Sequence, residues 1–144
     1  TAQFLAVALI VLLTQLYVGG LYLISGLAIG MDGLPPMQIL SWLLRGCLGG
    51  LSLAALQLFL SSFIRSFAVP IALALLLGVG GLAVVNTGYR LLYPYSLMLV
   101  GMNSNREEDL LAGQMPAFYV SCALFLTLFF ALGIWYLRRA DVRG

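Results

Sequence analysis

The sequence contains no histidine and no lysine, and charged residues make up only 8% of its 144 residues. Without histidine or lysine, the Ser-His-Asp, Cys-His and Ser-Lys arrangements of nucleophilic catalysis are excluded. All seven cations are arginine and the formal net charge is +2, so no nucleic-acid partner is predicted. No P-loop motif (GxxxxGKS or GxxxxGKT) occurs, so these residues do not hydrolyse nucleotide by themselves. We therefore expect neither an enzyme nor a cofactor site.

Cysteine is also scarce, with Cys47 and Cys122 both inside apolar stretches. Neither has a second cysteine or a histidine at metal-ligand spacing, so no metal site is predicted. We interpret both as small buried residues. The alternative is a disulfide, because the topology proposed below places both toward the outer ends of their helices.

Long uncharged apolar runs dominate the chain, and hydrophobic residues account for 62% of it. Residues 66–89 run for 24 positions without a charge. A helix of that length is about 36 Å long, enough to cross a hydrocarbon core of about 30 Å. The sequence therefore predicts an all-α polytopic membrane protein, folded as a single transmembrane domain, with four transmembrane helices at about 2–31, 40–64, 66–89 and 116–137.

Between the last two predicted helices, residues 90–115 are too interrupted by polar residues to span a membrane. The apolar part, 91–102, predicts an interfacial or re-entrant segment, whereas the polar stretch 103–109 belongs in water. An intramembrane proton relay is not expected, because all five acids lie outside the predicted spans. These are Asp32, Glu107, Glu108, Asp109 and Asp141.

The arginines indicate how the chain is oriented. Residues 138–144 carry three arginines in seven positions, so the C-terminus is predicted to face the cytoplasm. Counting crossings backward places 90–115 outside, the tight turn at Arg65 inside and Thr1 inside. The chain starts in an apolar stretch with no basic leader, so we interpret it as a fragment of a longer membrane protein.

Small residues recur at four-residue spacing, which lets helices approach closely in lipid. We expect these faces to pack within the helical bundle, and the alternative is a seam between two subunits. The predicted packing residues are Gly26 and Gly30 in the first helix, and Gly46, Gly50 and Ala54 in the second.

Polar side chains within the spans are Gln15, Gln57 and Asn86 among others. They predict hydrogen bonds between helices, and the alternative is that they face a translocation path. Arg45 is the one charge inside an apolar run, and burying it at mid-membrane would cost at least about 2.5 kcal/mol. We expect Arg45 to extend to the outer headgroups. The alternative is a role at the mouth of a pathway, where it would bind an anionic lipid or substrate.

The stretch LQLFLSSFIRSFAVPIALALLLGVGGL (56–82) resembles ABC-2 type permeases of the bacitracin-resistance and lantibiotic-immunity kind. Those permeases often carry a similar LQLWLS…RSFAVP passage between two late helices. A Tyr-Pro segment (here Tyr93-Pro94) and a last helix that ends in arginines follow it. The resemblance implies six helices in the full subunit, of which this chain would hold the third to sixth. It also implies that the segment before the last helix re-enters the membrane as short helices.

The same resemblance implies a plasma-membrane complex of two permease subunits, identical or different, with two separate cytoplasmic ATPase subunits. ATP hydrolysis on those partners would drive export of an amphiphilic compound or peptide antibiotic. The N-terminal part of such permeases, which usually meets the ATPase, has no counterpart in this sequence. The alternative is a non-transport membrane partner or assembly subunit that acts through helix–helix interaction.

Overall fold

The computed structural model describes residues 2–30, 36–103 and 108–141, and within these ranges the chain is all-helical without strands. The described helices are α1 (Ala2–Ala28), α2 (Pro36–Phe63), α3 (Ala68–Val84), α4 (Pro94–Gly101) and α5 (Met115–Asp141). Three of them, α1, α2 and α5, are long and apolar enough to cross a membrane. The all-α fold class is thus confirmed, and it is consistent with a helical membrane protein.

The long helices differ from their predicted bounds mainly at their ends. α2 begins at Pro36 rather than near residue 40, because proline is well suited to the first turn of a helix. The predicted end of the first helix at residue 31 lies outside the described residues, and α1 ends at Ala28. α5 extends past residue 137, with Arg138 and Arg139 in its last turn, where cations interact favourably with the helix dipole.

The predicted helix at 66–89 is too long at both ends. α3 has 17 residues, and a helix of that length is about 25 Å long, shorter than a hydrocarbon core of about 30 Å. It ends because Asn86, Thr87 and Gly88 favour a turn: the Thr87 backbone N–H and hydroxyl both donate to the Val84 carbonyl, at 2.9 and 2.8 Å. The absence of charge therefore predicted a helix that is too long. By its length alone, α3 does not establish a fourth membrane crossing.

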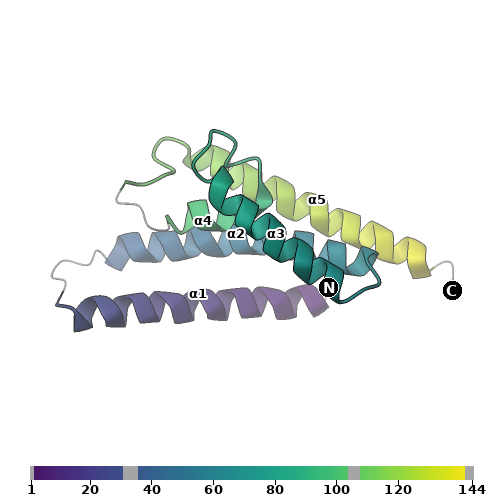
Figure 1. The fold of residues 1–144 in the computed structure, drawn as a ribbon, viewed down its shortest axis with the longest axis horizontal. Coiled ribbons are helices and arrows are strands. Elements are labelled where there is room, and N and C mark those ends of the chain that lie inside the picture. The colour runs from purple at the N-terminus through teal and green to yellow at the C-terminus, as the bar shows by residue number, and fades with distance from the viewer. Residues whose placement is uncertain (1, 31–35, 104–107, 142–144) are drawn as a thin grey trace.

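α2 is the central helix, and each of the other four packs against it. α1, α2, α3 and α5 run in alternating directions along the bundle (Figure 1), so α2 and α5 point the same way. The N-terminal end of α1, the turn between α2 and α3, and the C-terminal end of α5 lie at one end of the bundle. We call this the arginine-rich end, because Arg65, Arg138 and Arg139 lie there. Which end faces the cytoplasm stays a prediction.

The best-buried apolar cluster lies around α4 rather than along α1. It contains Leu97 and Val100 of α4, Leu111 of the following loop, and Phe118 and Cys122 of α5. The outer faces of the long helices are apolar and exposed: Leu5 is 68% and Leu9 is 56% accessible. Such broad apolar surface is unfavourable in water and suits contact with lipid.

Candidate functional site

A buried ion pair joins α2 to the loop before α5. The Arg45 side chain is only 4% exposed, and its Nη1 donates to both carboxylate oxygens of Asp109, at 3.1 Å to Oδ1 and 3.0 Å to Oδ2. The same guanidinium donates through Nε to the Ser41 carbonyl at 3.3 Å, and Nη1 lies 3.5 Å from the Met115 sulfur. A buried cation needs such a partner, because an unpaired charge in a low-dielectric interior is strongly unfavourable.

The expectation that Arg45 extends to the outer headgroups is therefore wrong. α2 starts at Pro36 and continues through Arg45 as one helix. The Arg45 side chain therefore lies beneath the loop that carries Asp109 and not at the lipid-facing surface. Asp109 is 25% exposed, so the pair lies at the boundary between the packed interior and solvent. The alternative prediction for Arg45, a role at the mouth of a pathway, stays open.

Asp109 is a site residue that the sequence reasoning missed. The sequence places it in the polar stretch 103–109 that is predicted to lie in water, but its carboxylate pairs with Arg45 and also accepts the Leu111 backbone N–H at 3.0 Å. Asn103 helps to set the loop, since it adopts φ 51° and its amide oxygen accepts the Leu110 N–H at 3.0 Å. Asparagine adopts this left-handed conformation more readily than most residues. A lone cation in an apolar helix indicates that an acid must pair with it, but it does not identify which acid.

Glycines bring α4 into backbone contact with the midpoint of α2. A Cβ at Gly49 would lie 2.6 Å from the Met98 backbone nitrogen, and a Cβ at Gly101 would lie 2.7 Å from the Arg45 carbonyl oxygen. Both positions therefore require glycine as long as α4 keeps this place. Through this backbone contact α4 packs between α2, α3 and α5, directly beside the ion pair.

The predicted packing residues divide between different neighbours. On α2, Gly46, Gly50 and Ala54 are all buried, but Gly46 faces Met102 whereas Gly50 faces α1. Gly49, which makes the closest backbone contact, was not predicted, because it falls outside the four-residue spacing.

On α1, Gly26 is buried, as a packing residue should be. The prediction for Gly30 is wrong: it lies beyond the end of α1 with φ +74°, and a Cβ there would meet nothing within 4 Å. Its role is to permit the left-handed backbone, which glycine adopts without steric cost.

The three predicted polar residues do not converge on one site. Gln15 of α1 is 3% exposed, and its Nε2 donates to the Met102 sulfur at 3.5 Å. Gln57 of α2 donates to the Tyr95 hydroxyl of α4. Asn86 lies in the exposed turn after α3. Gln15 and Gln57 thus link helices in this structure, and a translocation path through them stays a prediction.

Both cysteines are free thiols, so the alternative of a disulfide is not realised. Cys122 is buried in the cluster around α4, as the first interpretation states, and Cys47 is partly buried. The Ser52 hydroxyl donates to the Cys122 carbonyl at 3.0 Å, which ties α2 to α5.

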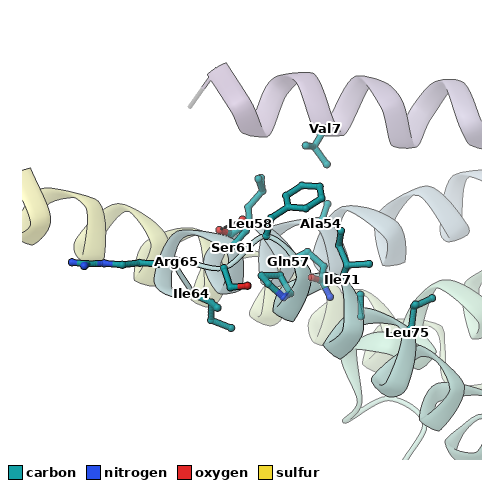
Figure 2. Close-up of a pocket in the computed structure, with 13 residues that line it drawn as sticks. Val7, Ala54, Gln57, Leu58, Ser61, Ile64, Arg65, Ile71 and Leu75 are labelled. Atoms are coloured by element: carbon teal, nitrogen blue, oxygen red, sulfur yellow. Dashed lines mark hydrogen bonds between the residues drawn. The ribbon is translucent and has the colours of Figure 1, made fainter.

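A groove of about 560 Å³ opens between α1, α2 and α3, and Arg65 in its lining places it toward the arginine-rich end. Figure 2 shows Gln57 and Ser61 of α2 in its middle and Arg65 at one end. Most of its lining is apolar. The lining residues are Val7, Ala54, Gln57, Leu58, Ser61, Ile64, Arg65, Ser66, Phe67, Pro70, Ile71, Ala74 and Leu75.

Two features therefore stand out: the ion pair beside α4, on the N-terminal half of α2, and the groove toward the arginine-rich end. Neither offers an arrangement of metal ligands, since no cluster of three such residues occurs in the described part of the chain. No protein family, curated protein or solved structure in our comparisons matches this chain.

Proposed function

We propose that this chain is part of the membrane-spanning permease subunit of an ABC-2 type transporter, which exports an amphiphilic compound or peptide antibiotic. The observation that carries the proposal is α4, a short helix between α3 and the last long helix that packs against the middle of α2. The sequence resemblance at 56–82 implies such a re-entrant helix at this place. In this proposal α3 completes the fourth crossing with the residues that flank it.

A transporter needs two arrangements of its helices, and the energy to interconvert them comes from ATP hydrolysis on a separate subunit. The ion pair between Arg45 and Asp109 is suited to such a change, because it ties a loop to the central helix through one replaceable contact. We infer that the outer end of the bundle opens by moving α4 and this loop relative to α2. The arginine-rich end would then be the end nearer the ATPase.

The test begins with the neighbouring reading frames, where the proposal predicts a gene that encodes a P-loop ATPase. The full-length subunit and that ATPase are then expressed together in a sensitive bacterium. We expect the two proteins to co-purify and to raise the inhibitory concentration of a peptide antibiotic such as bacitracin or a lantibiotic. Asp109→Asn should reduce this resistance, whereas Glu108→Gln, an exposed neighbour on the same loop, should leave it unchanged.

The alternative, a membrane partner without transport activity, predicts a different result. The subunit would then co-purify with another integral membrane protein and not with an ATPase. Absence of both a neighbouring ATPase gene and an ATPase in the purified complex would overturn the proposal.

A further inference from the structure

The groove extends along α2 for about half the thickness of a hydrocarbon core. Its lining on and just beyond α2 runs from Ala54 to Ile64, about 15 Å at the 1.5 Å rise of a helix. The hydrocarbon core is about 30 Å thick, so the length of the groove is about half of that thickness and matches one lipid leaflet. A transmembrane helix packed in the groove would need a groove as long as the full thickness of the hydrocarbon core, whereas a lipid acyl chain needs only half of that length.

The groove is also amphipathic along its length. Its inner part is lined mainly by aliphatic side chains such as Leu58, Ile71 and Leu75, with Gln57 and Ser61 among them. Arg65 and Ser66 lie at its outer end. Figure 2 shows the Arg65 side chain directed away from the apolar lining. Arg65 is exposed and makes no ion pair with any other residue that the structure describes. A cation above an apolar channel complements a phospholipid, whose anionic phosphate lies above its acyl chains.

The helices leave this groove accessible from the bilayer. Among the described helices, α1 and α3 do not pack against each other, and α2 forms the floor between them. A volume of about 560 Å³ is within the range of about 300–1,000 Å³ that is typical of ligand sites. An unfilled apolar groove of this size in a membrane would be occupied by the surrounding lipid.

We propose that the groove between α1, α2 and α3 binds an acyl chain of an anionic phospholipid, with the lipid phosphate at the Arg65 guanidinium. The lipid belongs to the leaflet at the arginine-rich end. This inference requires only that the chain lies in a bilayer, so it does not depend on the transport function proposed above.

The first experiment measures lipid affinity by native mass spectrometry of the purified protein titrated with phosphatidylglycerol or phosphatidylcholine. Arg65→Gln should weaken phosphatidylglycerol binding about fivefold, the effect expected of one cation at an anionic lipid surface, and should abolish the preference for it. Arg138→Gln is the matched control, because Arg138 is exposed at the same end but lies on α5 outside the groove. Unchanged affinity and preference in Arg65→Gln would overturn the proposal.

The second experiment tests the acyl-chain site. Ala74→Phe fills the groove and should weaken the binding of both lipids, whereas Ala72→Phe, on the exposed side of α3 outside the lining, should not. A photo-crosslinking residue at position 71 in native membranes should yield an adduct with the mass of a phospholipid. An adduct with a second copy of the chain or with another protein would instead show that the groove is a protein interface, and the lipid proposal would be wrong.

Discussion

Asp109→Asn removes the negative charge that pairs with Arg45 and changes little else in the side chain. The asparagine keeps an oxygen that can accept the Leu111 N–H, so the local turn is preserved while the carboxylate charge is lost. The Arg45 guanidinium, only 4% exposed, then has no counter-charge. Removing one member of a buried pair costs about 3–5 kcal/mol, and the 25% exposure of Asp109 places the expected cost near the lower value, about 3 kcal/mol.

Replacing Arg45 instead of Asp109 should cost less. Arg45→Met removes the buried charge and keeps an apolar side chain of similar length, while Asp109 can turn toward water. The charge left behind is then the partly exposed carboxylate, which water can solvate, and not a buried unpaired cation, so we expect a loss of about 1 kcal/mol or less. In the Arg45→Met background, Asp109→Asn should have little further effect. The double-mutant cycle should therefore give a coupling energy of about 2–3 kcal/mol, within the range seen for residues in contact.

The assay is reversible unfolding in mixed detergent micelles, followed by far-UV circular dichroism and by tryptophan fluorescence. Glu108→Gln is the control and should change the free energy of unfolding by less than about 0.5 kcal/mol, as most surface substitutions do. Equal losses for Asp109→Asn and Glu108→Gln would refute the assignment of the ion pair. So would a loss for Asp109→Asn that persists undiminished in the Arg45→Met background.

Gly49→Ala should destabilise the protein by about 1–3 kcal/mol, because its Cβ would overlap the α4 backbone, whereas Gly20→Ala, which meets nothing within 4 Å, should be neutral or stabilising in thermal unfolding. Tyr95→Phe removes the partner of the Gln57 amide and should cost about 0.5–1 kcal/mol in the same assay; an equal loss for the exposed control Tyr89→Phe would contradict a specific role. Glu108→Cys, in a background without the native cysteines, should react with an impermeant thiol reagent from outside intact cells; reaction only after lysis would reverse the predicted orientation.

Much of the helical framework could be predicted because lipid imposes simple rules. Apolar runs long enough to cross the hydrocarbon core indicated α1, α2 and α5. The same rule failed for α3, where Asn86, Thr87 and Gly88 end the helix although they carry no charge. Hydropathy counts apolar residues, whereas the end of a helix depends on which residues prefer a turn.

The site residues were predictable by type but not by partner. Gln57 and Arg45 were singled out because polar groups inside apolar runs need compensation, yet nothing in their own helix identifies Tyr95 or Asp109 as that compensation. These partners lie 38 and 64 residues further along the chain. Gly49 was missed for a related reason. It falls outside the four-residue spacing, and only the position of the α4 backbone shows that glycine is needed there.

Composition and pattern alone determined that this chain is helical, apolar and free of a nucleophile–base set, because these properties depend on which residues are present and in what local order. Only the tertiary structure decided that α4 packs against the middle of α2, that Arg45 is buried with Asp109, and that a largely apolar groove remains between α1 and α3. These features depend on contacts between residues far apart in the sequence, and local preferences do not encode such contacts.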